Sequence, residues 1–132
     1  MITGLNHITI AVSDLQQSIN FYMDVLGFTG HVKWETGAYL SVGELWFCLS
    51  CDTPSANTDY THIAFTVSDA NFSGYCQKVL AAGTKQWKQN TSEGNSLYIL
   101  DPDGHKLELH AGNLKSRLDA LKVQPYKQLE WL

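Results

Sequence analysis

The hydrophobic and polar positions along this chain follow one order twice. In the first copy, alternation with a period of two predicts a strand over residues 6–12. Apolar residues then recur at helical spacing as far as Gly27, a natural C-terminal cap, and Asp14 precedes them as an N-cap with Gln17 in the capping-box position. Three short strands are expected next, near residues 30–34, 38–42 and 44–50. The first copy is therefore predicted to have the order βαβββ.

The second copy repeats this order. A strand is expected over residues 60–67, and Asp69 is expected to cap a helix that ends by Gly83. The Asp-Pro-Asp-Gly sequence at residues 101–104 predicts a tight turn between the last two strands. The three strands are expected near residues 84–88, 96–100 and 106–110. A C-terminal helix carrying Leu114, Leu118 and Leu121, and an irregular end from Gln124, are expected to complete the chain.

The opening strands of the two copies are alike in sequence as well as in pattern. Residues 7–14 recur as residues 62–69 with five of the eight positions identical, so His7 and His62 occupy the same point of two modules. Two modules related by a rough two-fold axis can direct both imidazoles to one point. A chance match of two ordinary strand–cap–helix units is the alternative.

The predicted fold class is α+β, with two paired βαβββ modules in a single domain over residues 1–132. Module one covers about residues 1–51, module two about 59–111, and a C-terminal helix and tail 112–132. Polar residues and a proline between 51 and 59 predict the linker. Each module alone is too small to form a good core, so the modules are expected to pair, within one chain or between two chains.

Composition excludes several classes of function. The net charge is −4 and the nine lysine and arginine residues are scattered, which argues against a general nucleic-acid surface. The N-terminus has no signal-peptide pattern and the chain has no long apolar run, so neither export nor membrane spanning is indicated and a cytoplasmic location is expected.

The three cysteines are a poor basis for a disulfide framework because their number is odd. Cys48 and Cys51 have the spacing of a redox or zinc pair, but no second pair exists and Cys48 lies in an apolar strand. A packed thiol at Cys48 and a loop-edge thiol at Cys51 are the favoured interpretation.

A charged residue in the last predicted strand suggests a metal site. Side chains alternate between the two faces of a strand, so Glu108 is expected on the face opposite the leucines of this strand. If this face is buried, a bound cation would remove the free-energy cost of burying the Glu108 carboxylate. His7, His62 and Glu108 form a suitable ligand set for a catalytic Mn²⁺, Fe²⁺ or Zn²⁺ ion. The alternatives are a solvent-facing glutamate and hydrogen-bonded core histidines. His105 and His110 are weaker candidates, because one follows the turn and the other ends the strand.

A polar loop over residues 88–96, followed by Tyr98, offers a second cluster. It contains an ammonium group at Lys88, several hydroxyls and Gly94. Such a loop can hold an anion through side chains and backbone N–H groups, or a monovalent cation through oxygen atoms. A polar surface turn is the alternative.

These residues together resemble the vicinal oxygen chelate superfamily, which includes glyoxalase I and extradiol dioxygenases. More specifically, the chain resembles the FosA-type fosfomycin resistance proteins over residues 1 to about 126. The Ser-Glu-Gly sequence that follows Trp-Lys-Gln-Asn is the most specific part of the likeness. The motifs that carry it are Gly4-Leu5-Asn6-His7, Tyr60-Thr61-His62, Trp87-Lys88-Gln89-Asn90, Ser92-Glu93-Gly94 and Asp101-Pro102-Asp103-Gly104-His105-Lys106-Leu107-Glu108.

The resemblance implies a Mn²⁺- and K⁺-dependent glutathione transferase that opens the epoxide of fosfomycin. It implies a swapped homodimer in which His7 reaches the metal site of the partner chain, beside His62 and Glu108. Around the phosphonate and epoxide it implies Thr9, Trp46, Tyr60, Lys88, Ser92, Ser96, Tyr98 and Arg117. For K⁺ it implies Asn90, Ser92, Glu93, Gly94 and Ser96. On the thiol side it implies Trp34, Tyr39, Cys48 and Ser50, with Thr9 and Tyr39 as catalytic residues.

The sequence departs from this family on the glutathione side. Thr36 and Thr91 stand where family members often carry Gln and Arg, which bears on the strength of glutathione binding. Glu44 shares a predicted strand face with Trp46, where a carboxylate could activate water as in the hydrolase relatives, although a surface-turn role is favoured. The alternative functions are therefore a fosfomycin epoxide hydrolase, another thiol transferase of this fold, or a non-catalytic drug-binding protein.

Overall fold

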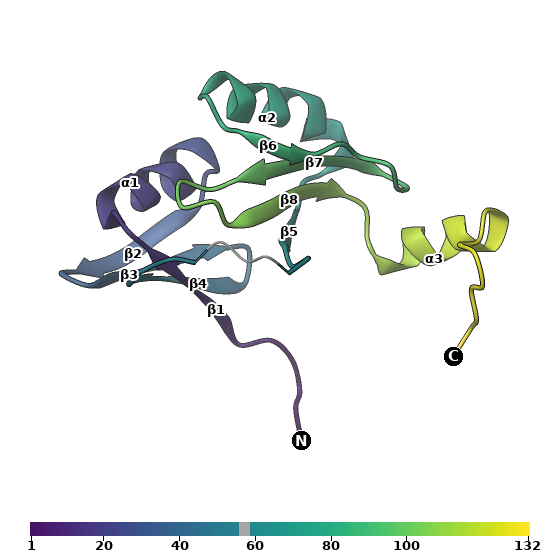
Figure 1. Ribbon diagram of the computed structural model, residues 1–132, viewed down its shortest axis with the longest axis horizontal. Coiled ribbons are helices and arrows are strands. Elements are labelled where there is room, and N and C mark those ends of the chain that lie inside the picture. The colour runs from purple at the N-terminus through teal and green to yellow at the C-terminus, as the bar shows by residue number, and fades with distance from the viewer. Residues whose placement is uncertain (56–58) are drawn as a thin grey trace. The chain divides into compact units, whose positions relative to one another are not determined.

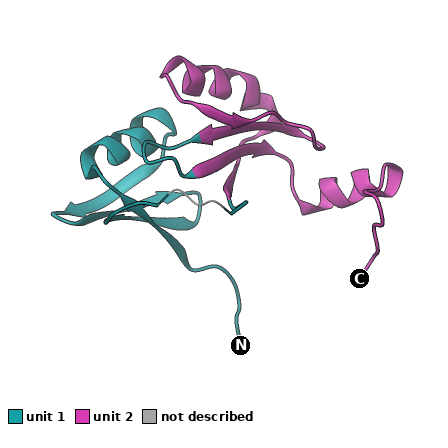
Figure 2. Cartoon of the chain, viewed as in Figure 1, with its two compact units in different colours: residues 1–61, 100–105 teal, residues 62–99, 106–132 magenta. Residues whose placement is uncertain are grey.

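The computed structural model describes residues 1–55 and 59–132, which form two compact units (Figures 1 and 2). Unit 1 comprises residues 1–61 and 100–105, and unit 2 comprises residues 62–99 and 106–132. Part of the linker expected between residues 51 and 59 lies outside the described residues. Among the described residues, no helix has both the length and the apolar character needed to cross a membrane.

Unit 1 contains a four-stranded sheet with strand order β1-β4-β3-β2. β1 runs parallel to β4, and the other neighbouring strands are antiparallel. The helix α1 packs against β3 and β4 (Figure 1). The elements are β1 (His7–Val12), α1 (Leu15–Asn20), a π-helical turn η1 (Phe21–Val25), β2 (Thr29–Trp34), β3 (Gly37–Val42) and β4 (Leu45–Cys51).

Unit 2 repeats this topology with strand order β5-β8-β7-β6, in which β5 is parallel to β8. The predicted α+β class and the βαβββ order of both modules are thus confirmed. Its elements are β5 (Ile63–Thr66), α2 (Asp69–Ala81), β6 (Gln86–Lys88), β7 (Asn95–Leu100), β8 (Lys106–Ala111) and α3 (Leu114–Val123). The chain after α3 has no regular secondary structure, as expected.

Each unit buries the apolar face that the period-two alternation predicts. In unit 1, Tyr22, Phe28 and Phe47 form an aromatic cluster with ring centroids 4.9–5.4 Å apart. In unit 2, Leu107 and Leu109 of β8 are fully buried. Alternation along β8 therefore leaves the opposite face of the second sheet for polar side chains.

The first helix begins as predicted but does not remain α-helical. The Asp14 carboxylate accepts a hydrogen bond from the Gln17 backbone N–H at 3.0 Å, which confirms the N-cap. From Phe21 the helix widens, and the Leu26 N–H bonds to the Phe21 carbonyl five residues earlier, at 3.0 Å. The adjacent Phe21 and Tyr22 side chains of this wider turn are both buried.

Two predicted boundaries in unit 2 are wrong. The N-cap of α2 is Ser68 and not Asp69, which is the first helical residue and accepts a hydrogen bond from Asn95 Nδ2 at 3.1 Å. The first strand begins at Ile63, three residues later than expected, because its pairing with β8 starts only at Ile63 and Leu107. His62 therefore precedes the strand.

The predicted turn at residues 101–104 is confirmed and is bound to unit 1. The Gly104 N–H donates to the Asp101 carbonyl at 3.0 Å, and Gly104 has a φ of 87°. The buried Asp101 carboxylate accepts a hydrogen bond from Tyr22 Oη at 2.7 Å, and the Asp103 carboxylate accepts one from the Ser13 N–H. Side-chain contacts thus fix this turn within unit 1.

Candidate functional site

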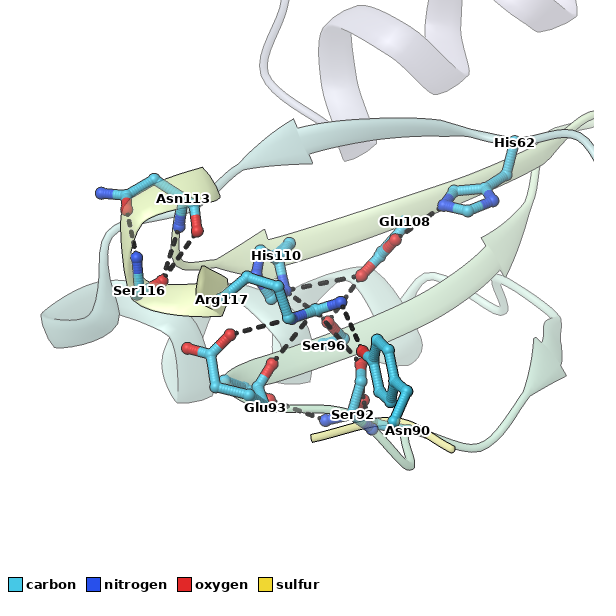
Figure 3. A network of polar contacts seen from close by, with 12 residues as sticks. His62, Asn90, Ser92, Glu93, Ser96, Glu108, His110, Asn113, Ser116 and Arg117 are labelled. Atoms are coloured by element: carbon cyan, nitrogen blue, oxygen red, sulfur yellow. Dashed lines mark hydrogen bonds and ion pairs between the residues drawn. The ribbon is translucent and has the colours of Figure 1, made fainter. Parts of the chain in front are cut away.

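The polar face of the second sheet is centred on Glu108 (Figure 3). Although Glu108 points away from the core leucines of β8, it is only 7% exposed. Its Oε2 lies 2.8 Å from Nε2 of His62, and its Oε1 accepts a hydrogen bond from Ser96 Oγ at 2.7 Å. Glu108 is therefore a buried, fully engaged carboxylate and not a solvent-facing strand residue.

The Glu108 carboxyl remains ionised in this environment. Burial by itself would raise its pKa, but the hydrogen bonds from Ser96 and His62 and the neighbouring imidazoles of His62 and His110 outweigh burial, so the pKa is lowered. An ionised carboxylate next to an imidazole nitrogen offers the oxygen and nitrogen donors that divalent ions such as Mn²⁺ and Zn²⁺ accept. This part of the predicted ligand set fits a metal ion.

The third predicted ligand, His7, lies at the start of β1 in unit 1. Its Nδ1 is 2.7 Å from the side-chain oxygen of Asn6, which orients the ring and leaves Nε2 available to a ligand. The ring also contacts the Trp46 indole, with centroids 4.4 Å apart. Within the described part of the chain, no group of three His, Cys, Asp or Glu side chains is gathered closely enough to hold a metal.

Aromatic rings surround His62 within unit 2. Trp87 and Tyr98 contact the imidazole at centroid distances of 5.9 and 6.2 Å, and Trp87 Nε1 donates to the Leu107 carbonyl at 3.0 Å. The Lys88 ammonium lies 5.0 Å from the centre of the Tyr98 ring. Lys88 and Tyr98, both predicted to contact substrate, are thus brought together beside His62.

The loop before β7 is closed by Asn90. The Asn90 amide donates to the Gly94 carbonyl at 2.8 Å and accepts from the Ser92 N–H at 3.1 Å. Gly94 has a φ of 79°, and a Cβ there would lie 2.8 Å from the Ala111 carbonyl oxygen, so only glycine fits. The oxygen-rich loop predicted from the sequence is therefore an ordered turn.

Arg117 of α3 joins this loop. Its Nε donates to the Glu93 carboxylate at 3.1 Å, and its Nη atoms lie 3.4 Å from Ser92 Oγ and from the Tyr126 hydroxyl. The Glu93 hydrogen bond is the main reason why the pKa of Arg117 is raised above its usual value. Asn113 and Ser116 form a reciprocal capping box that starts the helix and so positions Arg117.

The predicted thiol-side residues lie on one face of the first sheet. Ring contacts run from Trp34 to Tyr39 at 4.7 Å, from Tyr39 to Trp46 at 5.1 Å, and from Trp46 to His7. Trp34, Tyr39 and Trp46 are each more than one-third exposed. Unit 1 therefore presents an aromatic surface that begins at the predicted metal ligand.

The remaining candidates of unit 1 are placed by the strand register. Thr9 pairs with Cys48, and Cys48 with Tyr39, so these three side chains share a face with the aromatic surface, as does Ser50. Tyr60 also belongs to unit 1 and is exposed.

The cysteines behave as the packed-thiol interpretation predicts. Cys48 and Cys76 are buried, Cys51 is exposed, and all three are free thiols. Glu44 lies exposed in the turn between β3 and β4, and so not in the β4 strand. Thr36 and Thr91 are exposed in the turn after β2 and in the loop before β7.

Sequence reasoning missed the role of His110. Its Nδ1 lies 2.6 Å from Ser96 Oγ, which connects it to the Glu108 carboxylate (Figure 3). The sequence pattern that could have indicated this contact is the alternation along β8, which places His110 two residues from Glu108 on the same face. Its position at the end of the strand had suggested a minor role.

The two-module fold and the polar face of the second sheet define a class of protein. Residues 4–109 match the Glyoxalase/Bleomycin resistance protein/Dioxygenase superfamily, and the chain belongs to this family.

Within the family, the most informative similarities are to fosfomycin resistance proteins. The chain is 53% identical over 131 residues to glutathione transferase FosA of Serratia marcescens, covering 96% of this chain and 93% of that protein. It is 40% identical over 134 residues to metallothiol transferase FosB of Staphylococcus haemolyticus, with 92% and 93% covered.

The solved structures that resemble this fold include fosfomycin resistance proteins as well. The fosfomycin resistance protein FosX of Listeria monocytogenes, in complex with Mn(II) and sulfate, matches with a TM-score of 0.82 and 30% identity over 91% of this chain and 98% of that chain. FosX of Mesorhizobium loti matches with a TM-score of 0.78 and 33% identity, covering 89% and 99%.

Proposed function

We propose that this protein is a metal-dependent glutathione transferase that opens the epoxide of fosfomycin and so gives resistance to it. The observation that carries the proposal is the pairing of the buried Glu108 carboxylate with His62, whose ring contacts Tyr98 under the Lys88 ammonium, in a chain 53% identical to a glutathione transferase named FosA. Such an enzyme fits the cytoplasmic location expected from the sequence, because glutathione is a thiol of that compartment.

The proposed metal ligands are His7, His62 and Glu108, with Mn²⁺ as the expected ion. A Mn(II) complex of FosX, a similar fold, supports this choice. When bound, a divalent ion supplies Lewis acidity toward the epoxide oxygen. K⁺ is proposed to bind the oxygen atoms of the loop. Its proposed ligands are Asn90, Ser92, Glu93, Gly94 and Ser96.

The positive charges of unit 2 suit the phosphonate of fosfomycin. Lys88 offers a point charge, and Arg117 offers a planar fork of donors for oxyanions. Because a guanidinium has five N–H donors, Arg117 can keep its hydrogen bond to Glu93 and still donate to a substrate. The other residues proposed around the phosphonate and epoxide are Thr9, Trp46, Tyr60, Ser92, Ser96 and Tyr98.

Glutathione is proposed to approach along the aromatic surface of unit 1, where Tyr39 lies between Trp34 and Trp46. In the reaction, a sulfur–carbon bond forms as the epoxide carbon–oxygen bond breaks, and the proton lost by the thiol balances the one gained by the ring oxygen. Holding thiolate and epoxide together supplies a large part of the rate. Cys48 and Ser50 are the other residues proposed on this side, with Thr9 and Tyr39 as the catalytic pair.

The proposed assembly is a homodimer with exchanged modules, in which His7 of one chain completes the site formed by His62 and Glu108 of the other. The resemblance to FosA-type proteins carries this proposal. The need of each small module for a larger core supports it.

The deciding experiment incubates Mn²⁺-loaded protein with fosfomycin, with and without glutathione, and weighs the products by mass spectrometry. A glutathione adduct is expected. A hydrated diol formed without thiol, or unchanged drug, would overturn the transferase assignment. Glu108→Ala is expected to lose Mn²⁺ and activity while keeping its fold, because it removes a ligand and no core volume.

A further inference from the structure

A chain of three polar contacts crosses the face of the second sheet and ends on His110 (Figure 3). It runs from His62 Nε2 to Glu108 Oε2 at 2.8 Å, from Glu108 Oε1 to Ser96 Oγ at 2.7 Å, and from Ser96 Oγ to His110 Nδ1 at 2.6 Å. The side chains of Glu108 and His110 are 9% and 15% exposed, so protein groups and not bulk water satisfy most of this chain.

Counting protons fixes the direction of these hydrogen bonds. The Ser96 hydroxyl has one proton and donates it to Glu108, which as an ionised carboxylate can only accept. Ser96 Oγ must then accept from His110, so Nδ1 of the His110 ring carries a proton. The opposite direction would leave the Ser96 and Glu108 oxygens 2.7 Å apart without a proton between them.

The distances identify Ser96, and not Glu108 itself, as the partner of His110. His110 Nδ1 is 2.6 Å from the hydroxyl but 3.4 Å from the carboxylate. A direct hydrogen bond at the longer distance would be weak. Any effect of His110 on Glu108 therefore passes through the Ser96 hydroxyl.

Two glycines leave room for the His110 ring. A Cβ added to Gly112 would lie 2.6 Å from His110 Nε2, and one added to Gly94 would lie 3.0 Å from Cε1. The backbone of the loop before β7 and that of the segment before α3 thus enclose the imidazole. This enclosure limits the ring to a narrow range of orientations.

We propose that His110 is a positioning residue for the metal site: it holds the Ser96 hydroxyl so that its proton stays on Glu108 Oε1, which leaves Oε2, the oxygen facing His62, for the ion. This inference rests on the proposed function only in requiring a divalent ion at Glu108. The proposal also limits the hydrogen bonds that Ser96 can make, because its single hydroxyl proton is donated to Glu108. Toward a ligand, Ser96 Oγ can accept a hydrogen bond or contact a cation, but cannot donate to a phosphonate.

The first test measures Mn²⁺ affinity by the electron paramagnetic resonance signal of free Mn²⁺, without fosfomycin or glutathione. His110→Phe keeps the ring volume but removes the donor, and is expected to weaken Mn²⁺ binding about 10–100-fold. His110→Asn places an amide N–H where Nδ1 was, and is expected to stay within about 3-fold of wild type. Wild-type affinity in His110→Phe, or equal losses in both variants, would overturn the proposal.

A matched control is available on β2. The His31 ring lies 2.7 Å from the Ser41 hydroxyl, a similar histidine–serine pair without a carboxylate. His31→Asn is expected to leave Mn²⁺ affinity unchanged. An equal loss in His31→Asn and His110→Phe would mean that the effect is not specific to the Glu108 chain and would overturn the proposal.

A double-mutant comparison tests the route through Ser96. Ser96→Ala should weaken Mn²⁺ binding, and adding His110→Phe to it should change affinity less than about 2-fold, because both changes remove the same path. Independent, additive losses would contradict the proposal. Circular dichroism and thermal unfolding confirm that each variant is folded.

The position of this proton can be read in the unaltered protein. Nitrogen NMR of metal-free protein labelled at histidine should show a proton on His110 Nδ1, and an Nδ1 without a proton would overturn the proposal. Wild-type protein that binds no Mn²⁺ would overturn the proposed function. Wild-type binding combined with unchanged affinity in His110→Phe would overturn this inference alone.

Discussion

Lys88 and Lys106 form a natural comparison at the scale of single residues. Each places its ammonium over an aromatic ring of unit 2, Lys88 at 5.0 Å from Tyr98 and Lys106 at 5.3 Å from Trp87. The two lysines have similar packing, but only Lys88 is proposed to contact the phosphonate. Their substitution therefore separates substrate binding from a cation–π contribution.

Lys88→Ala should weaken fosfomycin use about 10–100-fold in kcat/KM without loss of Mn²⁺, because a hydrogen bond to a charged group contributes about 1.5–3 kcal/mol. Lys106→Ala should change kcat/KM less than about 3-fold. Steady-state kinetics with fosfomycin, together with Mn²⁺ titration of both variants, check this prediction. Equal losses in the two variants would contradict the assigned role of Lys88.

At the scale of elements, the hairpin of β2 and β3 shows how one glycine shapes the proposed glutathione side. A Cβ at Gly37 would lie 2.6 Å from a ring carbon of Trp34 and 2.8 Å from the Leu49 carbonyl oxygen. The indole could move, but the backbone oxygen lies in the paired strand β4 and cannot move easily. Gly37 is thus required for the position of Trp34 next to Tyr39.

Gly37→Ala should lower the free energy of unfolding by about 1–3 kcal/mol and alter the fluorescence of Trp34. Gly74→Ala, at an exposed position of α2 with no atom within 4 Å of the added Cβ, is the matched control and should raise stability by about 0.5–1 kcal/mol. Urea unfolding of both variants measures the two effects. A change in the free energy of unfolding that has the same sign in both variants would refute the packing argument.

For the whole molecule, the alkaline limit of stability depends on the fully buried Tyr22 and the half-buried Tyr75. Burial raises the pKa of Tyr75 to about 12, with a further contribution from Cys76. Burial and the neighbouring Asp101 carboxylate raise the pKa of Tyr22 well above its usual value. A raised pKa in the folded state favours the neutral phenol, so this stabilisation is complete below the pKa of an unfolded tyrosine, about 10.

The stabilisation should accordingly be lost as pH rises from about 10 through about 12. The free energy of unfolding in urea should be lower at about pH 11 than at about pH 8, and Tyr75→Phe should reduce this difference. Tyr22 and Tyr75 should also resist ionisation in ultraviolet titration until the protein unfolds. Six tyrosines that all ionise near pH 10 in the folded protein would contradict the prediction.

The proposed exchanged dimer gives a second prediction for the whole molecule. His7→Ala and Glu108→Ala proteins should each be inactive alone. When they are unfolded together and refolded, about one quarter of wild-type activity should return, because half of the dimers are mixed and each has one complete site. A mixture that stays inactive would mean that His7 and Glu108 of the same chain form the site.

The sequence by itself determined the repeated βαβββ order and which face of each strand is apolar. Period-two alternation and the capping residue Asp14 act over a few neighbouring residues, so they can be recognised without a fold. The same is true of the turn at residues 101–104. The α+β class followed from these local patterns.

Tertiary structure alone decided where the polar side chains meet. The alternation of β8 placed Glu108 and His110 on one face, but the pairing of β8 between β5 and β7 brought His62, just before β5, and Ser96 of β7 to that carboxylate. The ion pair between Arg117 and Glu93 likewise joins α3 to a loop far away in sequence. Such contacts depend on pairing between distant segments, which local patterns do not encode. For the same reason β5 began later than expected, since a strand extends only as far as its partner pairs with it.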